Sequence, residues 1–208
     1  GIERPCYVGK LEERRENGSI KIVTGIRRCG KSYLLFNLYV ERLRQMGVPE
    51  SRIVRVALDD NANAELRNPD RLADRLDRLL ADDDVMHYVM IDEVQYAISR
   101  EELRDVENPP RIYGVLNGLL RRRNADVYVT GSNSKLLSSD VRTEFRGRGD
   151  EVRGLPLSFS EYLPAHGGTA EEAWLDYVTY GGLPHVLSFS SDEGRGTYLT
   201  DLMDKVYL

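Results

Sequence analysis

The sequence predicts an α/β fold, with a parallel sheet between layers of helices. Short apolar runs rich in β-branched residues alternate with segments whose leucines recur at helical spacing. A strand, a helix and a second strand in succession form a unit whose two strands run parallel. The chain has 208 residues, of which 41% are hydrophobic, so it is long enough for one core and a smaller appended unit.

Five strands are expected along the chain. They are short runs of apolar and β-branched residues, at 20–24, 52–58, 85–91, 126–130 and 151–154. The second run alternates between polar and apolar residues, the third ends at two acidic residues, and Pro156 ends the fifth.

Three helices are expected between these strands, at residues 31–47, 70–80 and 111–123. Gly47 and Pro49 stop the first helix, and the pair Pro109-Pro110 breaks the chain before the third. Three arginines close the third helix, where cations complement the helix dipole.

The residues after Pro156 are expected to form a separate helical part. Ser158 with Glu161, and Thr169 with Glu172, fit the pattern of a capping box at a helix start. Gly181 is a suitable stop for the second of these helices, and an apolar stripe runs from residue 195 to the last residue. We therefore expect a core at residues 1–155 and, at 156–208, a helical lid followed by the start of a truncated C-terminal region.

Composition narrows the class of protein. The net charge is −5, which disfavours a module that binds nucleic acid over its whole surface, and no apolar run is long enough to span a membrane. The two cysteines, Cys6 and Cys29, are expected to be free thiols, because a disulfide at Cys29 would clamp a ligand-binding loop. These features predict a cytoplasmic protein.

A glycine-rich loop follows the first expected strand and precedes the first expected helix. Its sequence, GIRRCGKS, fits the pattern G-x-x-x-x-G-K-[ST] of a phosphate-binding P-loop. Glycines let backbone N–H groups approach phosphate oxygens, and the helix N-terminus adds partial positive charge. Lys31 is expected to bridge the β- and γ-phosphates and Ser32 to ligate Mg²⁺. The expected ATP-binding residues are Gly25, Arg27, Arg28, Cys29, Gly30, Lys31, Ser32 and Tyr33.

Two acidic residues end the third expected strand. Asp92 is expected to hold Mg²⁺ through water, and Glu93 to orient or deprotonate a water that attacks the γ-phosphate. A nucleotide switch needs only the aspartate, so Glu93 is the residue that favours hydrolysis.

Polar and basic residues after the fourth strand offer further candidates. Ser132 and Asn133 are both suited to bind the attacking water or the γ-phosphate. Arg146, Arg148 and Arg153 are candidates for an arginine that neutralises transition-state charge, supplied in cis or by a neighbouring subunit. The three histidines have no metal-site spacing, and Trp174 with most tyrosines is expected to pack in the core or between helices.

Six motifs appear in order along the chain: GIRRCGKS, IDEVQ, TGSNSKLLS, FRGRGDEV, LPLSFSEYL and YGGLP. Together they resemble a family of prokaryotic AAA+ superfamily P-loop ATPases, whose members usually continue into a C-terminal domain related to restriction-type nucleases. The resemblance implies a five-stranded sheet in the order 5-1-4-3-2 and a C-terminal helical lid.

The same resemblance implies roles for individual residues. Lys31 and Ser32 belong to its Walker A motif, and Asp92 and Glu93 to its Walker B motif. Ser132 or Asn133 is implied as the first sensor. Arg148 is implied as the arginine finger, with Arg146 a weaker candidate. The chain departs from the family pattern in the lid, where no arginine matches a second sensor; if the lid contributes one, Arg195 is the late candidate.

The leading functional hypothesis is a Mg²⁺-dependent ATPase whose hydrolysis changes the conformation of an attached C-terminal domain. The alternative is a nucleotide-gated switch with negligible turnover. A GTPase is disfavoured, since Asn133-Ser134-Lys135 does not match the base-reading motif Asn-Lys-x-Asp, and a small-molecule kinase lacks an acceptor-binding insert. Expected partners are ATP, further copies of the chain and DNA through the C-terminal domain, with no membrane.

Overall fold

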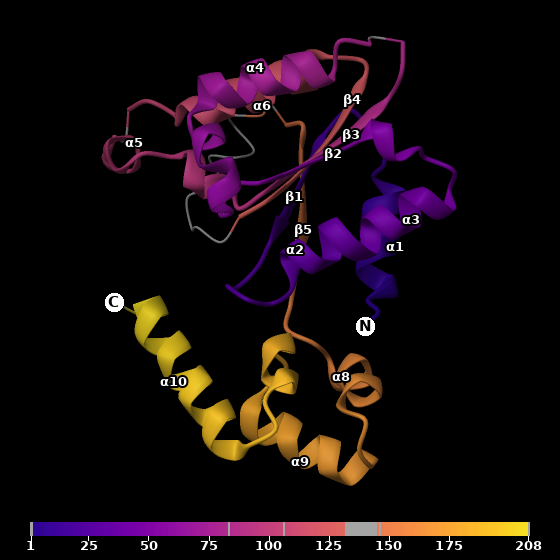
Figure 1. Cartoon of the computed structure of the whole chain (residues 1–208), viewed down its shortest axis with the longest axis vertical. Helices are drawn as coiled ribbons and strands as arrows, with labels where there is room; N and C mark the ends of the chain where they lie inside the picture. Colours follow the sequence, from indigo (N-terminus) through magenta and orange to yellow (C-terminus); the bar gives the residue numbers. More distant parts are fainter. Residues whose placement is uncertain (1, 83, 106, 132–144, 146, 208) are drawn as a thin grey trace. The chain divides into compact units, whose positions relative to one another are not determined.

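The structure is a computed structural model that describes residues 2–207 except 83, 106, 132–144 and 146 (Figure 1). Its contacts divide the chain into two compact units. The sheet unit contains Cys6–Gly25 and Lys31–Arg153, and the helical unit contains Gly1–Pro5, Ile26–Gly30 and Gly154–Leu208. The middle of the glycine-rich loop is therefore grouped with the C-terminal residues, although it lies between two segments of the sheet unit in sequence.

The sheet unit contains a five-stranded parallel sheet in the order β2-β3-β4-β1-β5. The strands are β1 (Ile20–Thr24), β2 (Ile53–Ala57), β3 (His87–Asp92), β4 (Ala125–Thr130) and β5 (Gly149–Arg153). Read from the other end, this is the order 5-1-4-3-2, so the fold class and strand order expected from the sequence are confirmed.

Helices cover both faces of the sheet (Figure 1). The main α-helices are α1 (Pro5–Glu13), α3 (Val40–Gln45), α4 (Pro69–Leu79) and α6 (Arg111–Arg121). Further helical segments are α2 (Lys31–Tyr33), η1 (Leu34–Tyr39), η2 (Glu50–Arg52), η3 (Asn61–Arg67), η4 (Val94–Ala97) and α5 (Arg100–Arg104). The segments α2, η1 and α3 follow one another without a break and form one helix with π-helical turns in its middle. This helix covers nearly the whole of the one predicted at residues 31–47.

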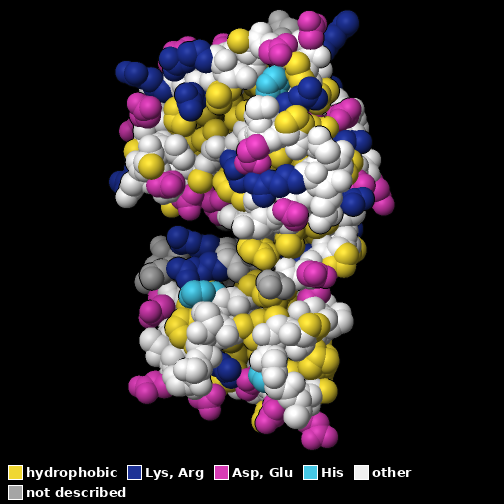
Figure 2. Space-filling view, turned by 45° about the vertical axis from the view of Figure 1, so that its right-hand side comes forward, with side chains coloured by type: hydrophobic (Ala, Val, Ile, Leu, Met, Phe, Trp, Pro, Cys, Tyr) yellow, Lys and Arg dark blue, Asp and Glu magenta, His cyan; other side chains and the backbone are white. Residues whose placement is uncertain are grey.

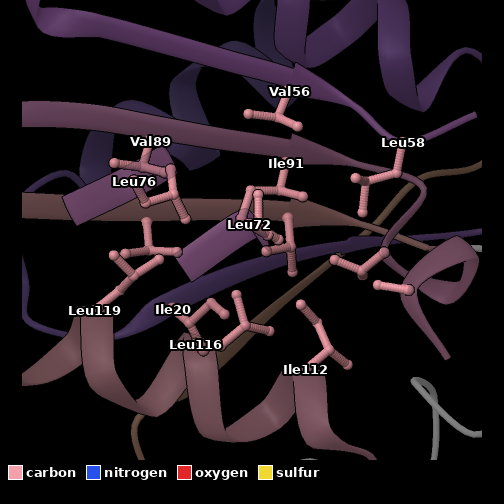
Figure 3. Close-up of a cluster of buried hydrophobic side chains, with 14 of the residues drawn as sticks. Ile20, Val56, Leu58, Leu72, Leu76, Val89, Ile91, Ile112, Leu116 and Leu119 are labelled. Atoms are coloured by element: carbon pink, nitrogen blue, oxygen red, sulfur yellow. The ribbon is translucent and has the colours of Figure 1, made fainter. Parts of the chain in front are cut away.

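Alternation along the strands divides the core into two layers, because successive side chains of a strand point to opposite faces. In β3, Val89 and Ile91 pack with leucines of α4 and α6 (Figure 3), whereas Tyr88 and Met90 pack with residues of α1 and α3. All six residues of β3 are buried, as expected for a central parallel strand that is covered on both faces.

The helical unit contains α8 (Phe159–His166), α9 (Ala170–Tyr180), η6 (Pro184–Ser188) and α10 (Asp192–Tyr207). Both capping boxes predicted from the sequence are present, and Gly181 ends α9 as predicted. Gly182 next to it has a steric role. A Cβ there would lie 2.2 Å from the carbonyl oxygen of Leu157, whose N–H donates to the Gly182 carbonyl at 2.7 Å. Only glycine permits this approach of two backbone segments.

The expectation that Trp174 is a packed residue is partly wrong. Its ring meets Phe159 and Tyr177 at centroid distances of 5.0 and 6.2 Å, yet 53% of the residue is exposed. Leu175 and Val178 on the same helix are also exposed, and hydrophobic side chains reach the surface of the helical unit in Figure 2. Of the 12 tyrosines, all except Tyr207 have a described side chain, and seven of these are buried, as expected.

The surface carries both signs of charge. Lys and Arg side chains are interspersed with Asp and Glu on the face shown in Figure 2. Among the described residues, no helix is long and apolar enough to cross a membrane. Cys6 is an exposed free thiol, and Cys29 is a buried one.

Candidate functional site

The candidate site lies where three neighbouring strands end. β3, β4 and β1 are adjacent and parallel, so their carboxyl ends meet at one edge of the sheet. β1 leads to Gly25, β3 ends at Asp92 and is followed by Glu93, and β4 ends at Thr130. The fold therefore brings residues far apart in sequence to the same edge.

Lys31 begins the helix that follows the glycine-rich loop, and the residue is buried, with a relative exposure of 4%. Its ammonium donates to the carbonyl oxygen of Gly25 at 3.2 Å, which folds the side chain back over the loop. Gly25 has a φ of 143° and Gly30 a φ of 91°, values that L side chains rarely adopt. The two motif glycines are thus required by the backbone path around the lysine.

Asp92 is buried, and its Oδ1 accepts a hydrogen bond from the hydroxyl of Thr130. Burial raises the pKa of Asp92, and the nearby charges of Glu93 and Asp59 add to that rise, although hydrogen bonds from Thr130 and Ser32 oppose it. An ionised carboxylate is therefore costly here, and a bound cation would offset that cost. The hydroxyl of Ser32 beside this carboxylate completes a set of hard oxygen donors that suits Mg²⁺.

Thr130 joins the two acidic residues. While its hydroxyl donates to Asp92, the same oxygen accepts the backbone N–H of Glu93 at 2.9 Å. Glu93 has left-handed backbone angles (φ 55°, ψ 52°), which are rare for a residue with a side chain. Such conformations persist only where the surroundings hold them, and they are common at active sites.

The carboxylate of Glu93 accepts a hydrogen bond from the side-chain amide of Gln95, in the short helix η4 that begins after it. Lys31, Ser32, Asp92 and Glu93, all expected site residues, thus lie at one edge of the sheet unit. Asp92 and Glu93 share Thr130 as a hydrogen-bond partner, and Ser32 lies close enough to Asp92 to lower the pKa of its carboxyl group.

Loop residues Ile26–Gly30 make their own contacts within the helical unit. Cys29 is 1% exposed, its Sγ lies 3.9 Å from the carbonyl oxygen of Gly154, and its own carbonyl accepts from Arg4 at 3.3 Å. The backbone N–H of Cys29 donates to the carbonyl of Ile26 at 3.3 Å. The side chain of Cys29, an expected ATP-binding residue, is therefore buried against backbone.

The two loop arginines differ in their surroundings. Arg28 has a φ of 65°, and its guanidinium lies 5.3 Å from the ring centroid of Tyr198 in α10, a cation–π arrangement. Arg27 is exposed, and Tyr33, another expected ligand-binding residue, is 39% exposed at the start of the helix. Arg28 thus contacts an aromatic side chain of the helical unit.

The arginine candidates lie at different edges of the sheet unit. Arg148 comes just before β5, its carbonyl accepts from Ile20 N at 2.8 Å, and its guanidinium donates to the Leu120 carbonyl at 3.4 Å. That is the amino edge of the sheet, one strand length, or roughly 17 Å, from the carboxyl edge. Arg153, the last residue of β5, pairs in register with Thr24 at the carboxyl edge.

Other candidates give mixed outcomes. Ser132, Asn133 and Arg146 lie outside the described residues. Arg195 donates to Asp176 at 2.5 Å, and His166 contacts the same carboxylate at 2.9 Å. No group of three or more His, Cys, Asp or Glu side chains in the described part of the chain could hold a metal ion by itself.

Three residues, two of the sheet unit and one of the helical unit, were not assigned roles from the sequence. Thr130 and Gln95 lie inside quoted motifs, so their proximity to the acidic pair was a usable signal. Arg4 forms no motif with its neighbours in the chain. Its partners, Cys29, Leu155 and Glu161, are at least 25 residues away in sequence, so only the structure reveals its role.

Comparison with known families identifies the class of protein that this fold and this sheet edge define. The family model described as an AAA domain matches residues 17–163. The chain belongs to that family, and its fold is that of an AAA+ P-loop ATPase.

Curated relatives are similar to the chain over most of its length. An uncharacterized protein of Haemophilus influenzae is 27% identical over 212 residues, which cover 100% of this chain and 50% of the relative. An uncharacterized protein of Methanocaldococcus jannaschii is 25% identical over 90% of this chain and 41% of the relative. The chain thus spans about half the length or less of these relatives.

Solved structures share the fold at low sequence identity. A DNA polymerase III gamma subunit-related protein of Thermotoga maritima has a TM-score of 0.55 and 10% identity, over 87% of this chain and 56% of that chain. PCH-2 of C. elegans has a TM-score of 0.53 and 16% identity, over 84% and 46%. ORC1 of Aeropyrum pernix, solved in complex with DNA, has a TM-score of 0.51 and 12% identity, over 85% and 50%.

Proposed function

We propose that the chain binds ATP with Mg²⁺ and hydrolyses it, and that hydrolysis changes the conformation of a C-terminal domain attached to it. One observation carries the proposal. Thr130 fixes Asp92 through its carboxylate and Glu93 through its backbone, at the sheet edge where Lys31 and Ser32 begin a helix.

Each residue has a role in this proposal. Lys31 binds the β- and γ-phosphates, and Ser32 and Asp92 are the residues that would hold the metal ion, which would supply positive charge beside the phosphates. Glu93 orients the attacking water and accepts its proton. The backbone of the loop from Gly25 to Gly30 surrounds the phosphates, and Asn133 or Ser132 is proposed to sense the γ-phosphate.

Replacing Glu93 by glutamine is expected to reduce phosphate release by roughly 10²- to 10⁴-fold, because general-base catalysis contributes that much. ATP affinity is expected to stay at the parent value, since glutamine has nearly the same shape. Phosphate release and ATP binding are measured for the parent, Glu93→Gln and Lys31→Ala, the last of which is expected to bind ATP poorly. Glu65→Gln, at an exposed glutamate, is the matched control. Parent-like turnover by Glu93→Gln contradicts the role given to Glu93.

A nucleotide-gated switch with negligible turnover is the second candidate, and the position of Arg148 favours it for an isolated subunit. Arg148 lies at the amino edge, away from the Lys31 and Glu93 of its own chain. We propose that it completes the site of a neighbouring copy. Turnover per chain that rises with protein concentration supports the oligomeric ATPase, and tight ATP binding without turnover at every concentration supports the switch.

DNA is proposed as a partner of the longer protein, through its C-terminal domain. The support is the likeness in fold to a protein solved in complex with DNA. Duplex binding by a full-length relative is expected to weaken steeply with salt, because phosphate contacts release counterions. Equally negligible binding at low and high salt contradicts it.

Two free thiols, one within the ligand loop, support a reducing compartment such as the cytoplasm.

A further inference from the structure

We propose that Gln95 is a positioning residue whose side-chain amide fixes the orientation of the Glu93 carboxylate. The proposal rests on the proposed function, in which Glu93 is the general base. Gln95 follows Glu93 by two residues, in the helix η4 that turns away from the end of β3. This helix places the two side chains in direct contact.

The identity of the contacting atoms follows from chemistry. The Nε2 of Gln95 donates to the Oε2 of Glu93. A carboxylate only accepts hydrogen bonds, so the nitrogen side of the amide must face it, and the carbonyl side must face away. Both ends of Glu93 are therefore held, its backbone N–H by Thr130 at 2.9 Å and its carboxylate by Gln95.

Gln95 restrains the Glu93 carboxylate without adding a charge. A lysine or arginine at this place would form an ion pair with Glu93, whereas the neutral amide of Gln95 holds one carboxylate oxygen through a hydrogen bond alone. Gln95 thus restricts the rotation of the Glu93 carboxylate. Orientation of a reacting group is itself a large part of a rate enhancement.

The other half of the same amide argues against a purely structural role. The Oε1 of Gln95 is buried and has no hydrogen-bond partner among the described residues. A buried acceptor without a partner lowers the stability of the folded state. An apolar side chain of the same length would avoid that penalty, so the fold alone gives little reason for glutamine here.

The test compares Gln95→Met with the parent chain. Methionine has the same unbranched length and lacks the amide. The kcat for ATP is expected to fall by roughly 10- to 100-fold, as is usual when the partner that orients a functional group is removed. The KM and the Kd for ATP are expected to stay at the parent values. The thermal midpoint is expected to equal or exceed that of the parent. Gln45→Met is the matched control, because Gln45 is the other glutamine of the chain and is exposed in α3.

A double variant separates positioning from any independent role. If Gln95 acts through Glu93, then Gln95→Met causes no further loss of kcat in the Glu93→Gln background. Multiplied losses in the double variant overturn the proposal. A parent-like kcat in Gln95→Met also overturns the proposal. The same holds if the kcat of Gln95→Met falls only in proportion to a loss of folded protein.

The same set of proteins distinguishes the two proposals. When Glu93→Gln is inactive and Gln95→Met retains the parent kcat, only the role of Gln95 is overturned. When Glu93→Gln hydrolyses ATP at the parent rate, Glu93 is not the base, and the proposed function and the role of Gln95 fail together.

Discussion

Replacing Asp126 by alanine is expected to lower the free energy of unfolding by about 3–5 kcal/mol, the range seen when one partner of a buried ion pair is removed. Asp126 lies in β4 and pairs with Lys21 of β1, and the side chains of the two residues are 2% and 0% exposed. The substitution leaves the ammonium of Lys21 in the core without its carboxylate.

The surroundings of the pair explain why it is tolerated in the parent. Asp126 also accepts from the hydroxyl of Tyr128 at 2.6 Å and from the backbone N–H of Glu16 at 3.0 Å. Burial and the charge of Asp126 raise the pKa of Tyr128 well above its usual range, so its hydroxyl remains a donor. Tyr39 lies 2.7 Å from that hydroxyl and extends the network toward η1.

Denaturant unfolding followed by far-ultraviolet circular dichroism measures the loss. Asp77→Ala is the control, because Asp77 forms an exposed pair with Arg122 at 2.7 Å, and such pairs contribute about 1 kcal/mol or less. The double replacement Lys21→Met with Asp126→Leu is expected to be more stable than Asp126→Ala, since it removes both charges. A loss in Asp126→Ala no larger than in Asp77→Ala contradicts the prediction.

The sheet could be predicted from the sequence because its signals are local. The buried strands are short β-branched runs, and the parallel arrangement follows from the helices between them. The strand order entered only through the resemblance to a family, since local patterns do not say which strands are neighbours. The helix α1 was not predicted, because its residues include three charges and a glycine, and its buried face is only Tyr7 and Leu11.

The site residues could likewise be predicted where their signal is local in the sequence. Lys31, Ser32, Asp92 and Glu93 could be found because each stands at a fixed place relative to a strand end. The network of Lys21 and Asp126 could not, because a charged residue inside a strand pattern usually indicates an exposed face. Its burial depends on the register of β1 and β4, which sequence periodicity does not determine.

Replacing Arg4 by alanine is expected to destabilise the helical unit by about 3 kcal/mol and to weaken ATP binding. Arg4 is 4% exposed, and its guanidinium donates to Glu161 at 3.1 Å, to the Leu155 carbonyl at 2.8 Å and to the Cys29 carbonyl at 3.3 Å. Alanine leaves these acceptors without their donor. Because Cys29 belongs to the glycine-rich loop, the same change removes a contact that fixes the loop backbone.

The effect of Arg4 on stability is expected to depend on pH. Burial tends to raise the pKa of Glu161, but hydrogen bonds from Arg4 and the Ser158 backbone outweigh it, so the pKa lies below its ordinary value of 4.5. A carboxyl group with a lowered folded-state pKa contributes its full stabilisation above the unfolded-state value, and loses it as pH falls through the folded-state value. The difference between parent and Arg4→Ala is therefore expected to be constant above about pH 5 and to shrink toward pH 3.

The single tryptophan of the chain makes this measurement specific to the helical unit. Trp174 lies in α9 and contacts Phe159 at the start of α8, the helix that Glu161 caps, so its fluorescence reports unfolding there. Arg14→Ala is the matched control. The ion pair of Arg14 with Glu13 is long, at 3.8 Å, and the side chain of Glu13 is exposed. Arg4→Lys is expected to fall between parent and alanine, because lysine retains the charge and loses the two-pronged guanidinium. If Arg4→Ala unfolds at the parent denaturant concentration, or if its loss of stability is the same at pH 3 and pH 7, the ion pair with Glu161 does not hold this unit together.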